Sequence, residues 1–104
     1  MIEKSRLRMK LEKAEARLHE VPAGVAETVR LRLARAQQAL DRAVDLWHEV
    51  DAKRLDLLAR GRTASSDIAR SWKETLRESR ASLSAARHEW REAARLLSRI
   101  PEQT

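Results

Sequence analysis

Apolar residues recur at alternating intervals of three and four along almost the whole chain. On a helix with about 3.6 residues per turn, this alternation keeps one face apolar. It is typical of coiled coils and helical bundles, and it favours an all-α fold. The three rows are Leu7, Leu11, Ala14, Leu18 and Val21; Val29, Leu33, Ala36, Leu40, Ala43, Trp47 and Val50; and Ile68, Trp72, Thr75, Ser79, Leu83, Ala86, Trp90, Ala93, Leu97 and Ile100.

Two short segments interrupt the rows and divide the chain into three predicted helices. The first contains Pro22 and Gly24, and proline cannot continue an established helix. The second runs from Arg60 to Asp67, where Gly61 suits the left-handed residue just past a helix end. Candidate N-caps for the helix that follows are Thr63, Ser65 and Ser66.

The predicted helices differ in length. They cover residues 2–20, 24–60 and 65–100, and the last one ends at Ile100 and Pro101. Short connections place consecutive helices side by side. We therefore predict one domain over residues 1–104, a long antiparallel helical hairpin with a shorter N-terminal helix. This three-helix, coiled-coil-like bundle is expected to form oligomers.

The composition agrees with long amphipathic helices and excludes several classes of protein. Charged residues make up 37% of the chain and hydrophobic ones 42%, with two glycines and two prolines. There is no cysteine, so disulfides, thiolate metal sites and thiol catalysis are excluded. Neither an apolar run of membrane-spanning length nor a signal-peptide core is found, and we expect a cytoplasmic protein.

No combination of residues in the sequence specifies a reaction or a ligand. The three histidines, His19, His48 and His88, do not converge in the predicted hairpin and do not form a zinc-binding pair. The chain also lacks a glycine-rich phosphate-binding loop and a nucleophile motif. We expect no enzyme, no metal and no cofactor.

The only aromatic residues are Trp47, Trp72 and Trp90, each followed two positions later by glutamate. All three tryptophans fall on the apolar rows, and a residue two positions on is turned about 200° around the helix. The glutamates therefore face elsewhere, and the repeated phrase is not a joint Trp–Glu site. We interpret the tryptophans as anchors of helix packing.

The short first helix cannot cover the whole hairpin. Each long helix reaches about 54 Å at 1.5 Å per residue, whereas the first reaches only about 28 Å. It can cover residues 25–42 and 83–100, so the other end of the hairpin remains a helix pair with excess apolar surface. Such surfaces commonly mark interfaces. The predicted interaction surface consists of Trp47, Val50, Leu55, Leu57, Leu58, Ile68, Trp72 and Leu76.

These observations predict a non-catalytic protein–protein interaction module, an adaptor, scaffold or chaperone-like helical subunit. Its expected partner is a second copy of itself or another helical protein, and no membrane is involved. The alternative is a basic helical protein that binds nucleic acid, because the formal net charge is +6. The residues for that alternative form one row on the third helix: Arg70, Lys73, Arg77, Arg80, Arg87, Arg91 and Arg95.

The glutamates of the third helix argue against that alternative. Glu74, Glu78, Glu89 and Glu92 share the helix with these arginines, and opposite charges three or four residues apart pair along a helix. We therefore expect a face that is solvated or joined to the neighbouring helix by salt bridges, and no retention on nucleic acid.

Overall fold

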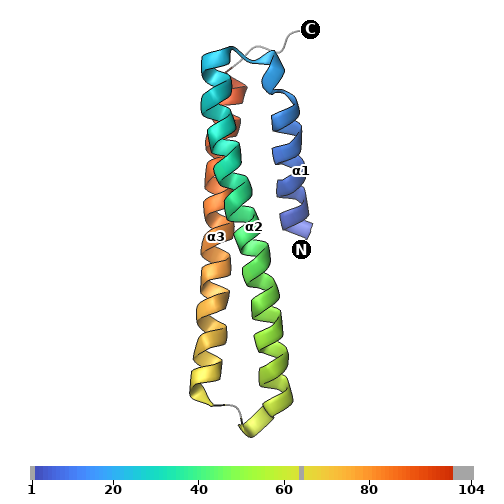
Figure 1. The fold of residues 1–104 in the computed structure, drawn as a ribbon, viewed down its shortest axis with the longest axis vertical. Helices are drawn as coiled ribbons and strands as arrows, with labels where there is room; N and C mark the ends of the chain where they lie inside the picture. The colour runs from blue at the N-terminus through green and yellow to red at the C-terminus, as the bar shows by residue number, and fades with distance from the viewer. Residues whose placement is uncertain (1, 64, 100–104) are drawn as a thin grey trace.

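The predicted all-α class is confirmed by a computed structural model, which describes residues 2–63 and 65–99 (Figure 1). The elements are the α-helices α1 (Ile2–Ala16), α2 (Ala23–Arg60) and α3 (Ser66–Ser98), and the 3-10 helices η1 (Leu18–Glu20) and η2 (Gly61–Thr63). The described residues contain no strand. The predicted end of the last helix at Ile100 and Pro101 lies outside the described residues.

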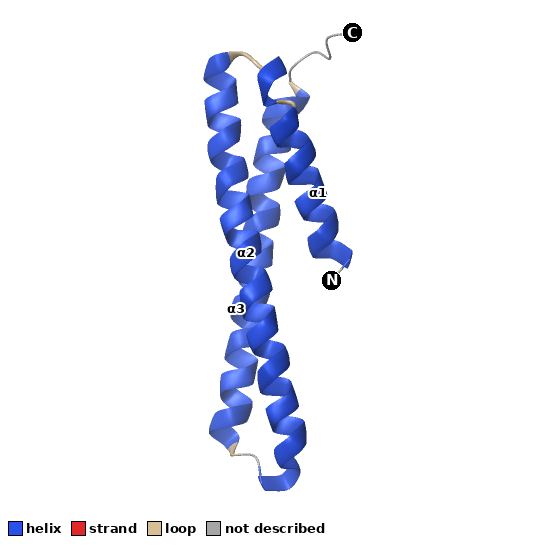
Figure 2. Ribbon diagram, turned by 45° about the vertical axis from the view of Figure 1, so that its right-hand side comes forward, coloured by secondary structure: helices blue, strands red, loops and turns tan. Residues whose placement is uncertain are grey.

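Helices α2 and α3 form the predicted antiparallel hairpin and run side by side along its whole length (Figures 1 and 2). The molecule is a rod that measures 63 × 19 × 14 Å. Two serines of α3 fix the distance between the helices, because small side chains allow close approach. The Ser82 hydroxyl donates to the Ala39 carbonyl at 2.8 Å, and the Ser79 hydroxyl donates to the Ala43 carbonyl at 3.3 Å.

Helix α1 packs against its own hairpin, beside the end that holds the first connection (Figure 2). Its buried row interlocks with both long helices in one apolar cluster. The buried members are Leu7, Leu11, Ala14 and Leu18; Val29, Leu33, Ala36 and Leu40; and Ala86, Ala93 and Leu97. We call this end the covered half: α1, η1, α2 residues 23–45 and α3 residues 81–98. The open half is the remainder, α2 residues 46–60 and α3 residues 66–80.

The turn between α2 and α3 uses the residues that the sequence predicted. Gly61 has φ +54°, a value that side chains disfavour, and its N–H closes α2 on the Leu57 carbonyl. Ser65 caps the next helix, since its hydroxyl accepts from the Ile68 N–H at 3.3 Å. Thr63 does not cap α3, because its hydroxyl donates back to the Arg60 carbonyl at 2.7 Å.

The first connection is tighter than predicted. The helix expected over residues 2–20 ends at Ala16, and a 3-10 turn follows it from Leu18 to Glu20. This turn keeps Leu18 buried in the core cluster while the chain reverses direction. Val21 is extended, as a residue before proline prefers to be, and Pro22 leads directly into α2.

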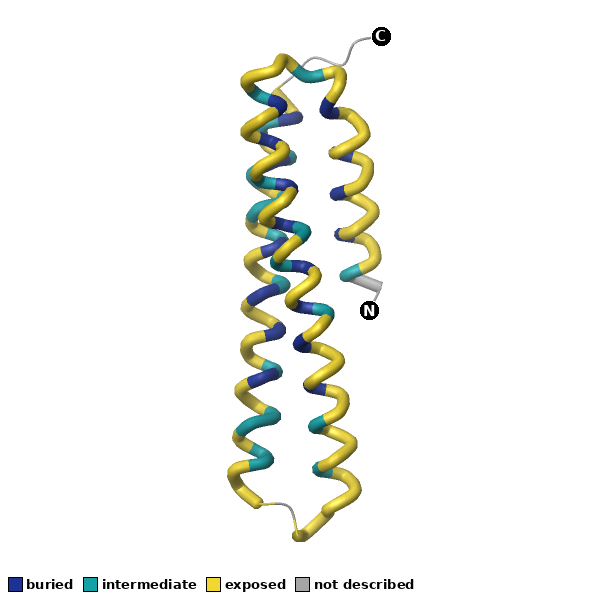
Figure 3. Tube along the Cα trace, viewed as in Figure 1, coloured by how far each residue is buried: buried dark blue, intermediate teal, exposed yellow. Residues whose placement is uncertain are grey.

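The buried positions of the two halves differ in chemistry (Figure 3). The covered half is filled almost entirely by aliphatic side chains. In the open half the buried residues are Leu46, Val50, Thr75 and Ser79. Beyond Val50 on α2, and before Thr75 on α3, no described residue is buried. The hairpin therefore loses its core toward the turn.

Candidate interaction surface

The face of α2 that carries α1 is defined by a heptad pattern. Leu33 and Leu40, one heptad apart, belong to the cluster that α1 joins. Val44 lines an open cavity of about 200 Å³ together with Lys4 and Arg8 of α1. In a supercoiled helix, residues seven apart keep the same orientation toward a neighbour. These positions therefore define the seat of α1 on α2.

The same seat continues into the open half, where α1 covers only part of Trp47, through Lys4. Trp47 lies one heptad after Leu40, and Leu58 lies two heptads after Val44. On α3, Leu83 packs against the core cluster, and Leu76 stands one heptad before it. Trp47 is 37% exposed and Leu58 is 67% exposed. The open half thus presents an unoccupied extension of the α1 seat.

An ion pair interrupts this extension. Arg54, one heptad after Trp47, donates to the Asp51 carboxylate at 2.9 Å, and both side chains are about half exposed. The extension therefore has an apolar residue at each end, Trp47 and Leu58, and an ion pair between them. A partner seated here gains most from the two apolar ends, because exposed ion pairs contribute little stability.

The eight residues of the predicted interaction surface fall into three groups. Trp47, Leu55 and Leu58 are exposed. Leu57, Ile68, Trp72 and Leu76 are half-buried at the edges of the helix pair. Val50 is only 3% exposed and belongs to the interior between α2 and α3. The surface that a partner can contact is therefore narrower than the predicted set and is carried mainly by α2.

A polar clamp joins the two helices within the open half. The Lys53 ammonium donates to the Ser71 hydroxyl at 2.7 Å and to the Thr75 hydroxyl at 2.9 Å. It also pairs with Glu49 at 3.3 Å, one turn earlier on α2. Sequence reasoning missed this clamp because Lys53 stands outside the apolar row. Its long stem crosses the helix interface, as lysine stems do on amphipathic surfaces.

Trp72 lies between the two hydroxyls of this clamp in the sequence. Its indole Nε1 is buried and has no hydrogen-bond partner among the described residues. A buried donor without a partner costs about 1–3 kcal/mol. The open half therefore carries a local cost in addition to its scarcity of buried aliphatic side chains. Trp90, the corresponding tryptophan of the covered half, packs against the apolar cluster as predicted.

Lys4 marks the boundary between the two halves. Its ammonium lies 4.8 Å from the centre of the Trp47 ring and donates to the Ala43 carbonyl at 3.5 Å. Burial lowers the pKa of Lys4, because the charged form loses water. The indole and the carbonyl both favour the cation at this position. The first turn of α1 thus covers part of Trp47 and leaves the rest exposed.

The basic row of α3 is placed on one face of the helix, and six of its seven members are exposed. Arg87 is half-buried. Among the described residues, Glu92 pairs with the row through Arg95, at 3.4 Å. Glu78 and Glu89 instead reach Arg42 and Arg32 on α2, at 3.7 and 3.0 Å. Ion pairs between the helices, as expected, are therefore present, because Glu78 and Glu89 lie on the flank of α3 that faces α2.

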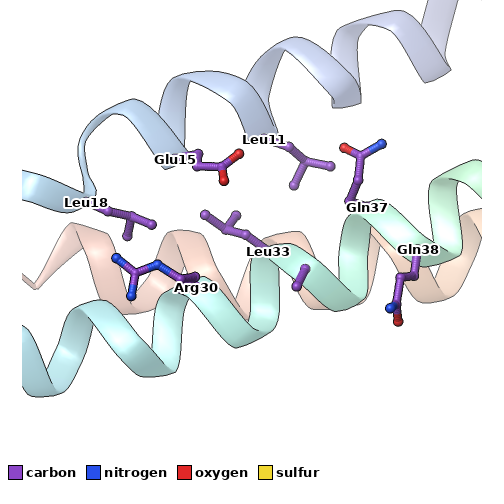
Figure 4. A pocket seen from close by; sticks show the side chains of 8 residues that line it. Leu11, Glu15, Leu18, Arg30, Leu33, Gln37 and Gln38 are labelled. Carbon is purple, nitrogen blue, oxygen red and sulfur yellow. The ribbon is translucent and has the colours of Figure 1, made fainter.

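An open cavity of about 270 Å³ between α1 and α2 is lined by leucines and by polar side chains (Figure 4). The labelled lining residues are Leu11, Leu18, Leu33, Glu15, Arg30, Gln37 and Gln38. Among the residues described, no three histidine, aspartate or glutamate side chains gather as a metal site would require.

No protein-family model matches this sequence. Comparisons with curated proteins and with solved structures likewise find no match. Within the described residues, no helix combines the length and the apolar character needed to cross a bilayer.

Proposed function

We propose that this protein is a non-catalytic interaction module that self-associates through its open half. It would act in the cytoplasm as an adaptor, scaffold or chaperone-like subunit. The observation that carries the proposal is the unoccupied extension of the α1 seat, with Trp47 and Leu58 exposed on it. The covered half supports the proposal, because the same face of α2 there packs against the apolar row of α1.

The apolar residues of the open half offer enough energy for a specific complex. Burying an exposed leucine or indole contributes roughly 1.5–3 kcal/mol. Trp47, Leu55 and Leu58 are large hydrophobic side chains that stay exposed in a single copy. When two copies bury them together, each contribution counts twice. This sum supports micromolar association after the entropy cost of binding.

A second copy fits the open half better than a long helix from elsewhere. Helix α1 fills the same face in the covered half, so an occupant has only the open half available, about 25 Å of hairpin. Another open half has this length and the same apolar face. Two open halves that pack face to face and antiparallel form a closed, two-fold four-helix bundle, with each α1 clear of the partner.

The test compares two leucines of α2 with similar exposure. Leu58 is 67% exposed on the extension, and Leu31 is 52% exposed in the covered half. Leu31 precedes Leu33 by two residues and is therefore turned about 200° away from the α1 seat. We expect Leu58→Glu to abolish a dimer seen by sedimentation equilibrium at about 100 µM, where micromolar complexes are mostly formed. Leu31→Glu should leave the mass unchanged.

Two results would overturn this proposal. If the unmodified protein is strictly monomeric at about 100 µM, self-association is wrong, and only another helical protein remains as an occupant. If Leu31→Glu weakens the dimer as much as Leu58→Glu does, the interface lies elsewhere. Circular dichroism of both variants controls for folding, since the described residues of the protein are mostly helical.

A further inference from the structure

Most cations in the basic row of α3 have no acidic partner among the described residues. From Arg70 to Arg95 the row extends about 37 Å along the helix. Five of its members have neither a hydrogen bond nor an ion pair to the described residues: Arg70, Lys73, Arg77, Arg80 and Arg91. The row contains no acidic residue, because the glutamates of α3 occupy the other flank.

Helix α1 carries a second row of cations. Arg6, Lys10, Lys13 and Arg17 recur at intervals of four, three and four and are all exposed. None of the four forms a hydrogen bond or an ion pair within the described residues. A helix places residues at this spacing on one face, so α1 has a basic edge of its own.

Contacts with α2 show that both rows lie on one side of the molecule. On α1, Arg8 pairs with Asp41 at 3.2 Å, so the flank of Arg8 faces α2. The cation row of α1 lies on the opposite flank of its apolar face. On α3, Glu89 and Ser82 contact α2, and the basic row is turned away from them. The two rows therefore share the face formed by α1 and α3, opposite α2.

From this geometry we infer that the face binds the phosphate backbone of double-stranded nucleic acid. Packed helices lie about 8–10 Å apart, so the face offers two adjacent lines of cations in the covered half. The basic row of α3 is about 37 Å long, which is the length of about 11 base pairs at 3.4 Å per pair. Phosphate contacts of this kind carry no sequence preference. The ligand is thus duplex nucleic acid of any sequence.

The residues around the rows disfavour other polyanions. Single strands are held by exposed aromatic rings on which bases stack, and neither row contains an aromatic residue. Membrane-surface helices insert an apolar face between lipids. The apolar faces of α1 and α3 are instead buried in the core cluster. The inference is independent of self-association, because the exposed residues proposed for the dimer lie mainly on α2.

The first experiment measures the affinity for a fluorescent duplex of about 20 base pairs between about 50 and 200 mM salt. The logarithm of the binding constant should fall linearly with the logarithm of the salt concentration, with a slope near −0.9 for each phosphate contacted. We expect a slope of about −4 or steeper, since five cations of the basic row have no partner among the described residues and can each contact a phosphate. No binding at about 50 mM salt would overturn the inference, as would tighter binding to single strands or anionic vesicles.

A matched pair of triple variants locates the site. The first reverses Arg77, Arg80 and Arg91 to glutamate, and the second reverses three exposed cations outside both rows. The control positions are Arg30, Arg35 and Arg62. Both variants change the net charge equally, but only the first should reduce the salt slope, by about 3. Equal slopes for the two variants would contradict a defined basic face.

The double variant Lys10→Glu with Lys13→Glu tests the contribution of α1. If the face includes both helices, this variant should reduce the slope by about 2, because two contacts are lost. An unchanged slope would overturn the two-row face. Circular dichroism of every variant confirms that helicity is retained.

Discussion

The covered and open halves share the same two helices but are held together by different interactions. In the covered half, aliphatic residues of α1, α2 and α3 converge, and Leu40 and Val29 at their centre are 0% exposed. In the open half, a lysine–hydroxyl clamp and the buried hydroxyls of Thr75 and Ser79 replace most of that core. The apolar rows of α2 and α3 therefore form a fully buried core only where α1 packs against them.

This difference has a consequence for stability. Apolar burial is the main favourable term in folding, whereas a hydrogen bond contributes only about 0.5–1.5 kcal/mol net. The open half has fewer buried aliphatic residues, and the Trp72 Nε1 there has no partner. We expect this half to open more often than the covered half in a single copy. A second copy would remove the difference.

The largest expected effect distinguishes the cores of the two halves. Leu40→Ala leaves a cavity between three helices and should lower the free energy of unfolding by about 2–5 kcal/mol. Leu76→Ala, at a half-buried position of the open half, should cost less than about 2 kcal/mol. Urea denaturation in dilute protein measures both. Similar losses would show that the two halves are equally well packed, and the proposed difference between them would be wrong.

A smaller effect distinguishes the two ends of the rod through their glycines. Gly61 at the open end has φ +54° and ψ −123°, a conformation that side chains disfavour, and Gly61→Ala should cost about 1–3 kcal/mol. Gly24 at the covered end is helical, with no atom within 4 Å of an added Cβ. Gly24→Ala should therefore stabilise the protein by about 0.4–1 kcal/mol. Thermal unfolding measures whether each variant is more or less stable than the unmodified protein. A stabilising effect of Gly61→Ala would contradict the turn geometry.

The sequence predicted those parts of the fold that depend on local chemistry and periodicity. The apolar rows predicted three helices. Gly61 and Ser65 predicted the end of α2 and the start of α3, on either side of the second turn. The length difference between the helices indicated that α1 would leave one end uncovered. Each of these inferences uses residues close in sequence or a period that continues over several turns.

Other features depend on which flanks face each other, and a single row of residues does not specify this. The pairing of Glu78 and Glu89 with α2 follows from the rotation of α3 in the hairpin. Neither glutamate has a cation three or four residues away on α3, so its partner comes from the neighbouring helix. The Lys53 clamp and the burial of Val50 have the same origin. The apolar pattern therefore assigns eight residues to the interaction surface, although only three of them are exposed.

Hydrogen exchange at two protein concentrations tests the central claim most directly. In dilute, monomeric protein, amides of α2 residues 50–60 and α3 residues 68–76 should exchange faster than those of residues 29–40. At about 100 µM, protection should rise in the open half alone, because a second copy covers it there. If both halves are equally protected at every concentration, the open half is neither less stable nor the site of assembly, and the account is wrong.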